Sequence, residues 1–280
     1  MDKETGLEFE GALEFAKNIP KAEIGIIGGT GVYDPRFLEE TREVRVDTPF
    51  GPPSDAITLG VYKGRNVAIL PRHGKKHTIP PHRINYRANI FALKKIGVEQ
   101  IISPCAVGSL QDYIKPGEFV LVDQFIDRTH GRESSFYDES RVCHISVADP
   151  VCPDLTTLAR VSAKKLGLRF NPYGTYVCIQ GPRFSTRAES RMFRGMGAHV
   201  IGMTLVPECV LAREAEICYL SIATVTDYDT FKEQSVSIEQ VVKTMKENED
   251  KLKALLTDII PKIPKVRNCP CKDALRDALL

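Results

Sequence analysis

The chain has 280 residues, 42% of them hydrophobic, with 38 lysines and arginines against 36 aspartates and glutamates. This composition is ordinary for a globular protein with a sizeable core. The basic residues are scattered and no apolar stretch approaches the roughly 20 residues of a membrane span, so we expect neither nucleic acid nor a membrane as partner. The charged N-terminus lacks a signal-peptide pattern, and we expect a cytoplasmic protein that binds a small molecule.

Short apolar runs alternate with helical patterns along the chain, which predicts an α/β fold. A hairpin signal in 48–70 adds antiparallel strands, so we expect a mixed central sheet flanked by helices. We expect one domain over 23–264, between an N-terminal tail (1–22) and a C-terminal tail (265–280) with a Cys-x-Cys segment. The predicted strands are 24–27, 67–70, 100–102, 119–122, 176–179, 200–201 and 219–226, and the predicted helices are 86–96, 155–166, 187–194, 207–216 and 238–256.

A glycine-rich turn, GIIGGTG, begins at Gly25 within the first predicted strand. Its glycines let the backbone approach an anion closely, and Thr30 adds a hydroxyl donor. The dinucleotide spacing G-x-G-x-x-G is broken in each frame, because Ile27, Thr30 or Tyr33 stands where glycine is required. We favour a phosphate or ribose-phosphate site, while a plain tight turn and a nucleotide-cofactor loop stay open.

The segment PRHGKKHTIPPHR follows the second predicted strand. The planar fork of Arg72 suits phosphate and His73 is a second donor, so the pair predicts an oxyanion clamp at a strand end. His73 and His77 have the i, i+4 spacing of metal ligands, but the glutamate of HExxH is absent and Pro80-Pro81 prevents a long helix. We therefore favour the clamp over a metal site or solvated loop residues.

Two later segments also follow predicted strands. In SPCAVGSL, the backbone N–H groups of Cys105 and Ala106 are candidates to complete an anion cage at a third strand end. Loops at several strand ends together predict a crevice at the carboxyl edge of the sheet. In QGPRFSTRAES, Ser185 is the expected N-cap of a helix that carries Glu189 in its early turns.

Two carboxylates, Asp227 and Asp229, follow the last predicted strand in TVTDYDTF. In an extended segment their side chains point the same way, so both are candidates to face one edge of a ligand such as a purine. Burial raises the pKa of a carboxyl, which then delivers a proton to a leaving group. A divalent-metal site and a locally capped turn are the alternatives.

Eight cysteines are spread along the chain. With no CxxC pair and no signal peptide, the pattern argues against a secreted disulfide scaffold and a structural zinc site. Free buried thiols are the simplest interpretation, and intracellular disulfides of a hyperthermophile are the alternative. The cysteines are Cys105, Cys143, Cys152, Cys178, Cys209, Cys218, Cys269 and Cys271.

Taken in order, these segments resemble the 5'-methylthioadenosine phosphorylase family of nucleoside phosphorylases, from about Ala22 to Pro264. The motifs that carry the resemblance are IGIIGGTG, TPFGPPSD, PRHGKKH, YRANIFALK, DQFIDRT, GPRFSTRAES, GMTLVPE and TDYD. The resemblance implies a pentosyltransferase that converts 5'-methylthioadenosine and phosphate to adenine and 5-methylthioribose-1-phosphate, without metal or cofactor. It also implies a single-domain nucleoside phosphorylase fold, with a mixed, partly barrel-like sheet, in a homotrimer or a dimer of trimers.

The resemblance also implies roles for individual residues. The positions that match the family's phosphate site are Thr30, Arg72, His73, Cys105, Ala106 and Thr204. The positions that match its nucleoside site are Asp227 as the catalytic acid, Asp229, Phe184 beside the base, Met203 near the ribose, and His77 and His144 around the ribose and its 5' substituent. The resemblance implies that His144 reaches in from a neighbouring subunit. Two positions depart from the family: Cys105 replaces Thr or Ser, and Gln180 replaces Glu before GPRF. The tail resembles relatives from hot environments and implies disulfides Cys269–Cys271 and Cys152–Cys218.

Three other functions stay open. A purine nucleoside phosphorylase of broader specificity would act on adenosine, inosine, guanosine or methylthioinosine. An NAD(P)-binding oxidoreductase would use Gly25–Gly31 as a dinucleotide loop, and a non-catalytic purine-binding protein would show no turnover.

Overall fold

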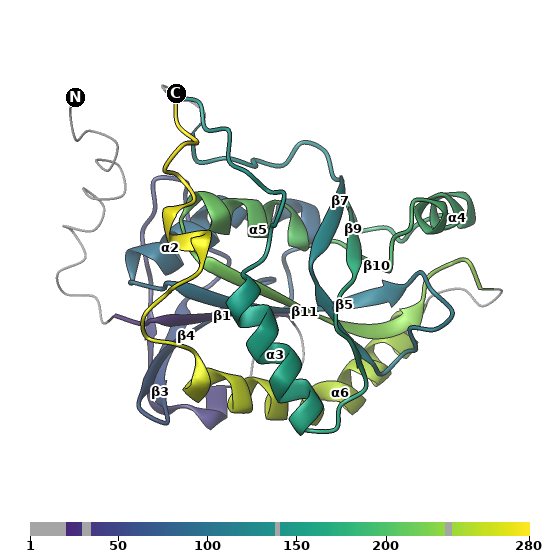
Figure 1. Cartoon of the computed structure of the whole chain (residues 1–280), viewed down its shortest axis with the longest axis horizontal. Coiled ribbons are helices and arrows are strands. Elements are labelled where there is room, and N and C mark those ends of the chain that lie inside the picture. Colours follow the sequence, from purple (N-terminus) through teal and green to yellow (C-terminus); the bar gives the residue numbers. More distant parts are fainter. Residues whose placement is uncertain (1–20, 30–34, 138–140, 233–236) are drawn as a thin grey trace.

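The computed structural model describes residues 21–29, 35–137, 141–232 and 237–280 (Figure 1). Within these residues eleven strands form one mixed sheet, with helices on both faces. The strands are β1 (Ile24–Gly28), β2 (Glu39–Val44), β3 (Ile57–Tyr62), β4 (Arg65–Pro71), β5 (Gln100–Ser109), β6 (Phe119–Val122), β7 (Gln124–Arg128), β8 (Phe170–Asn171), β9 (Thr175–Ile179), β10 (Val200–Gly202) and β11 (Cys218–Tyr228). The α-helices are α2 (Tyr86–Lys95), α3 (Pro153–Lys165), α4 (Arg187–Gly195), α5 (Leu205–Glu214) and α6 (Ile238–Ile259).

Strand β5 is the branch point of the sheet. The main strand order is β2-β3-β4-β1-β5-β10-β9-β7, and a second arm leaves β5 through β11, β6 and β8. On one edge, β1 pairs with residues 100–102 of β5, and β10 pairs antiparallel with residues 108–109. Between these two neighbours, residues 103–107 have no strand partner on that edge in the described part of the sheet. The sheet is thus not closed into a barrel. It has a gap beside residues 103–107 of β5, between the ends of β1 and β10.

Two apolar cores lie on the two faces of the sheet. In β1 and β4, adjacent residues alternate between them: Ile27 and Leu70 belong to one core, and Ile26 and Ile69 to the other. This is the period of two expected of strands that are buried on both faces. Helices α2 and α5 contact each other over one core, and α3 and α6 contact each other over the second (Figure 1). None of the described helices is long and apolar enough to cross a membrane.

The mixed α/β fold agrees with the sequence prediction, and each predicted helix and strand is present with small shifts at its ends. Two details were wrong. Strand β5 continues to Ser109 rather than ending at 102, so Cys105 and Ala106 lie within a strand and not after it. The N-cap of α4 is Thr186, which forms a capping box with Glu189, and not Ser185.

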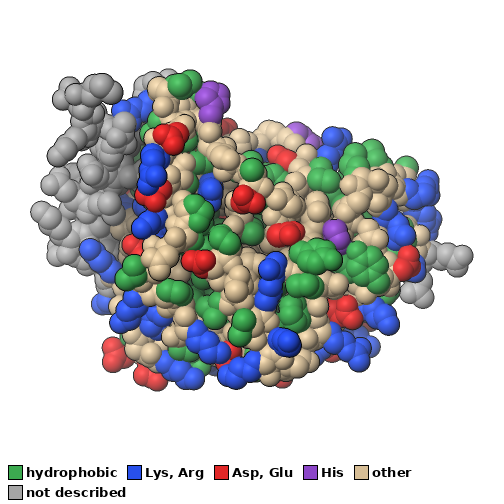
Figure 2. All heavy atoms as spheres, viewed as in Figure 1, with side chains coloured by type: hydrophobic (Ala, Val, Ile, Leu, Met, Phe, Trp, Pro, Cys, Tyr) green, Lys and Arg blue, Asp and Glu red, His purple; other side chains and the backbone are tan. Residues whose placement is uncertain are grey.

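The C-terminal residues 265–280 pack onto the domain. Arg267 Nη1 donates to Glu216 O at 2.6 Å, and Leu279 forms a β-bridge with Cys143. All eight cysteines are free thiols in the structure, so the expected disulfides Cys269–Cys271 and Cys152–Cys218 are not formed in it. On the face shown in Figure 2, basic and acidic side chains are interspersed, in keeping with the net charge of +2.

Candidate active site

A cavity of about 500 Å³ opens beside the gap in the sheet. This volume is typical of a site that encloses a small ligand. Ten of the predicted site residues line it: Arg72, His73, His77, Cys105, Ala106, Phe184, Met203, Thr204, Asp227 and Asp229. Of the other two, Thr30 lies outside the described residues, and His144 is an exposed residue next to the C-terminal tail, where its N–H donates to Ala278 O at 2.7 Å. Ten of the twelve predicted site residues therefore meet in one cavity.

Unpaired backbone of β5 forms one end of the cavity. Residues Pro104, Cys105, Ala106 and Val107 line it from the stretch that lacks a partner between β1 and β10. Backbone N–H groups at a broken strand edge are available to an anion, because no carbonyl of a neighbouring strand accepts from them. This end of the cavity is therefore suited to phosphate.

Arg72 is buried next to this edge and is paired with Glu208. Its side chain is 2% exposed and that of Glu208 is 1% exposed. Nε donates to Glu208 Oε2 at 2.7 Å and Nη2 to Oε1 at 2.9 Å, which is a bidentate pair. Although burial opposes the charge, Glu208 raises the pKa of Arg72 above its usual value. The guanidinium therefore stays a cation at the wall of the cavity.

Two further side chains hold the Arg72–Glu208 pair in place. Ser103 Oγ accepts from Arg72 Nη2 and donates to Glu208 Oε1, both at 2.6 Å. Tyr219 Oη donates to the same carboxylate oxygen at 2.8 Å. Among the described residues, Arg72 Nη1 donates only to Pro104 O, at 3.3 Å, so its second N–H is left for a ligand.

His73 stands next to Arg72 as a neutral ring. Burial, and then the charge of Arg72, lower the pKa of His73 to about 4. Its Nδ1 is 2.8 Å from Ile79 O, and a carbonyl only accepts, so Nδ1 carries the proton. Nε2 then carries no proton. It accepts a hydrogen bond from a hydroxyl group of phosphate, or it donates one after a bound anion has raised the affinity of the ring for a proton. The ring of His77 lies 4.5 Å away, centroid to centroid.

Cys105 contributes its backbone rather than its side chain. Burial raises the pKa of the Cys105 thiol to about 11, so it is neutral at pH 7, and its sulfur lies 3.9 Å from Ser221 Oγ.

Gln180, the other departure from the family pattern, is hydrogen-bonded: its Oε1 accepts from His130 N at 3.1 Å and from Arg132 Nε at 3.2 Å. Both substitutions are therefore accommodated locally.

Asp227 and Asp229 line the cavity where β11 ends, and Asp227 is paired there with Gly108 of β5. A β-bulge shifts the register of β11 on β5 between Val225 and Asp227, so Thr226 lines the cavity together with both carboxylates. Thr226 Oγ1 donates to Asp227 Oδ1 at 2.6 Å. Burial raises the pKa of the Asp227 carboxyl to about 6, and the nearby charge of Asp229 adds to the rise. Asp227 therefore holds a proton more readily than an exposed carboxyl does.

Ser185 holds Asp229, a role that the sequence prediction missed. Its Oγ lies 2.7 Å from each carboxylate oxygen of Asp229 and donates to this carboxylate. Asp229 is only 3% exposed, so this bond offsets part of the cost of burying its charge. The missed residues Glu208, Ser103 and Ser185 all lie in segments singled out in the sequence. No linear pattern indicates their partners, since Glu208 lies 136 residues from Arg72, Ser103 lies 105 residues from Glu208, and Ser185 lies 44 residues from Asp229.

Helix α6 supplies an apolar wall. Its residues Ile238, Val241, Val242, Met245 and Leu252 line the cavity, with Asn248 and Glu249 as the polar members. Asn248 is 1% exposed, and its Nδ2 has no hydrogen-bond partner among the described residues. This wall therefore suits an apolar group that carries few hydrogen-bonding atoms.

Known proteins resemble the chain over nearly its whole length. A family profile described as the phosphorylase superfamily matches residues 23–261. The chain belongs to this superfamily. The S-methyl-5'-thioadenosine phosphorylase of Thermofilum pendens is 56% identical over 260 residues, covering 93% of this chain and 99% of its own; that of Saccharolobus solfataricus is 54% identical over 264 residues, covering 93% and 98%.

Solved structures of the superfamily agree with this assignment. A methylthioadenosine phosphorylase from an antarctic soil metagenomic library superposes with a TM-score of 0.88 at 42% identity, covering 93% of each chain. The methylthioadenosine phosphorylase from Schistosoma mansoni, in complex with adenine, has a TM-score of 0.84 at 38% identity, covering 87% of this chain and 92% of its own. Superfamily membership leaves the dinucleotide-dependent oxidoreductase without support.

We expect Glu208→Gln to lower the free energy of unfolding by about 3–5 kcal/mol, because the neutral amide leaves the buried Arg72 charge uncompensated. Chemical denaturation measures this change. Glu43→Gln is the control, since it breaks an exposed pair with Lys75 and is expected to cost less than about 1 kcal/mol. Equal costs for the two variants would contradict the account of the buried pair.

Proposed function

We propose that this protein catalyses the phosphorolysis of 5'-methylthioadenosine, giving adenine and 5-methylthioribose-1-phosphate. The observation that carries the proposal is one cavity with an anion-binding edge at one end and a carboxyl of raised pKa at the other. Inorganic phosphate is the co-substrate, and no cofactor takes part. The names of the relatives, S-methyl-5'-thioadenosine phosphorylases at more than 50% identity, support the substrate.

The two ends of the cavity supply the two halves of the reaction. An oxygen of phosphate, held by the β5 backbone, Arg72 and His73, forms a bond to C1' as the bond from C1' to the purine nitrogen breaks. The electron pair of the broken bond goes to the purine, and the proton held by Asp227 neutralises it. The ribose passes through a state with oxocarbenium character, which the phosphate anion stabilises. No covalent enzyme intermediate is required.

The walls of the cavity support the choice of nucleoside. The acidic end, Asp227 and Asp229, accepts hydrogen bonds from a 6-amino group and donates one to a ring nitrogen when Asp227 is protonated. The apolar face of α6 favours a methylthio group over the 5'-hydroxyl of adenosine, because a hydroxyl would lose its hydration there. Phe184, 41% exposed, is placed to close over the base, and Met203 and His77 to contact the ribose.

The proposal includes an assembly, because His144 is outside the cavity of its own chain. We propose a cytoplasmic homotrimer, or a dimer of trimers, in which His144 reaches the ribose side of a neighbouring subunit's site. Its exposure and its place beside the C-terminal tail support this role. Thr30 completes the phosphate site in the same proposal.

The direct test is to incubate pure protein with 5'-methylthioadenosine, adenosine, inosine or guanosine, with and without phosphate, and to quantify free base and sugar phosphate. We expect adenine release from methylthioadenosine that depends on phosphate and is matched by an equal amount of sugar-1-phosphate. Release without phosphate would indicate a hydrolase, preference for inosine or guanosine a purine nucleoside phosphorylase of broader specificity, and no release a non-catalytic purine-binding protein.

We expect kcat/KM for methylthioadenosine, at saturating phosphate, to fall with rising pH above an apparent pKa of about 6, because Asp227 must carry a proton.

The same carboxyl affects stability. Its raised pKa means that the folded state binds this proton more tightly than the unfolded chain does, so the free energy of unfolding decreases as pH rises from about 4 to about 6. Asp227→Asn should therefore remove this pH dependence, lower turnover and leave stability at pH 7 unchanged or higher. A profile in the variant that matches the wild type would contradict the role of Asp227.

We expect Val241→Asn to lower the ratio of kcat/KM for methylthioadenosine to that for adenosine roughly tenfold, because burying the methylthio group contributes about 1–2 kcal/mol. Initial rates with both nucleosides give the ratio. The matched control is Lys246→Asn, on the exposed side of the same helix, which should leave the ratio unchanged. An unchanged ratio in Val241→Asn would show that α6 does not bind the 5' substituent.

A further inference from the structure

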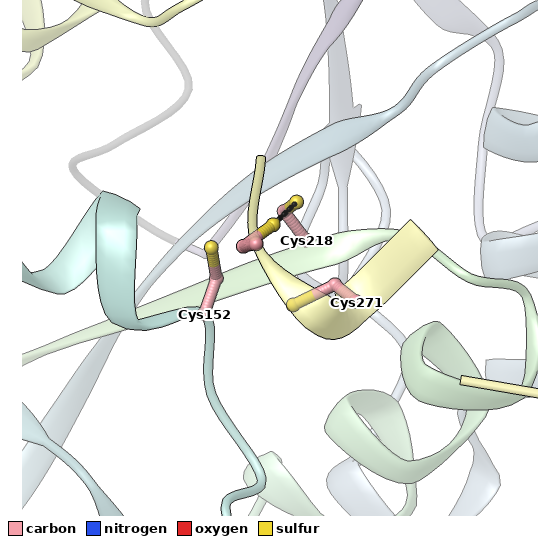
Figure 3. A group of neighbouring side chains, drawn as sticks. Cys152, Cys218 and Cys271 are labelled. Atoms are coloured by element: carbon pink, nitrogen blue, oxygen red, sulfur yellow. Dashed lines mark hydrogen bonds between the residues drawn. The ribbon is translucent and has the colours of Figure 1, made fainter. Parts of the chain in front are cut away.

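Four cysteine side chains meet outside the active-site cavity, on the second core. Cys152 precedes α3, Cys218 begins β11, and Cys269 and Cys271 come from the C-terminal Cys-Pro-Cys segment. Their sulfurs all lie within 4.8 Å of one another, and Figure 3 shows how these elements bring them together. Among the described residues this is the one group of cysteine, histidine and carboxylate side chains close enough to share a metal ion.

The spacing of the sulfurs is that of a metal-binding tetrad. Zinc binds four thiolates at about 2.3 Å in a tetrahedron, which places the sulfurs about 3.8 Å from one another. The sulfurs of Cys218 and Cys269 are 3.2 Å apart, and none of the six separations exceeds 4.8 Å. A disulfide needs about 2.05 Å. The four sulfurs are not bonded in pairs, and only small shifts are needed for them to surround one ion.

The cluster is shielded from water and lies next to one cationic side chain. All four cysteines are buried, at 1–4% exposure, so water does not compete for the ion. Arg213 Nη1 donates to Cys271 Sγ at 3.6 Å, and Arg213 Nε is buried without a hydrogen-bond partner among the described residues. Cys152 is also the N-cap residue of α3, where the helix dipole favours negative charge.

We propose that Cys152, Cys218, Cys269 and Cys271 bind one zinc ion as a closed structural site. The four thiols lose their protons to solvent as the ion binds, leaving a doubly negative centre that the Arg213 guanidinium partly balances. Because all four positions are occupied by sulfur, the ion has no open position for catalysis.

The site would tie the end of the chain to the sheet. Two ligands come from residues 269–271, and the other two lie at the starts of α3 and β11. The sequence contains no CxxC pair, and its cysteine spacing therefore argued against a zinc site. The spacing does not show that the fold brings together cysteines that are far apart in the chain. This inference is independent of the proposed reaction, because the cluster lies outside the cavity.

The test uses the full chain, expressed in zinc-supplemented medium and purified with its thiols reduced. We expect elemental analysis to find one zinc ion per chain, and replacement by cobalt to give the visible absorption of tetrahedral thiolate-bound Co²⁺. Cys269→Ser should retain less than roughly one-tenth of the zinc and unfold at a lower temperature, because metal binding contributes to folding. Cys143→Ser, which alters a half-buried cysteine outside the cluster, should keep the full amount.

Three results would overturn the proposal. The first is wild-type protein that binds neither zinc nor cobalt under these conditions. The second is a zinc content that Cys269→Ser leaves unchanged. The third is a non-reducing peptide map of protein purified without reductant in which the four cysteines form disulfides, since sulfurs bonded in pairs do not bind the ion. The wild-type measurements do not depend on the folding of any variant.

Discussion

The buried ion pair between Arg72 and Glu208 is the interaction on which the site depends. A bidentate pair this far from water stabilises the fold only if every remaining donor and acceptor is satisfied, and Ser103, Tyr219 and the carbonyls of Ile27 and Pro104 satisfy nearly all of them. One Nη1 N–H remains at the cavity wall. The pair thus fixes a positive charge beside the broken edge of β5, where the proposed phosphate binds.

The branching of the sheet at β5 explains why the β5 backbone and the two carboxylates line the same cavity. β5 pairs with β1 only at its start and with β10 only at its end, so its middle is exposed to the cavity. The same strand pairs along its whole length with β11, which contains Asp227 near its end and is followed directly by Asp229. One pair of strands therefore presents both the β5 backbone and the carboxylates to the cavity, with a β-bulge between Val225 and Asp227.

The sequence predicted what depends on local patterns. Apolar period and flanking Gly or Pro located the helices and most strands, and strand-end motifs together with the family resemblance located ten cavity residues. It did not predict what depends on long-range contacts: the partner of Arg72 is 136 residues away, and Ser185 contacts Asp229 rather than capping α4. The extension of β5 through Cys105 was missed because Pro104 interrupts the apolar run. A strand tolerates proline where it has no partner on one edge, and among the described residues β5 has none on one edge at this point.

The central claim is that phosphate and base occupy opposite ends of one cavity. A crystal structure of the protein with phosphate and adenine tests it most directly. The account predicts phosphate within hydrogen-bond distance of the β5 backbone at Cys105 or Ala106 and beside Arg72, with a ring nitrogen of adenine at the Asp227 carboxyl and α6 over the space left for the 5' substituent. Phosphate at the Asp227 end, or adenine against Arg72, would contradict it.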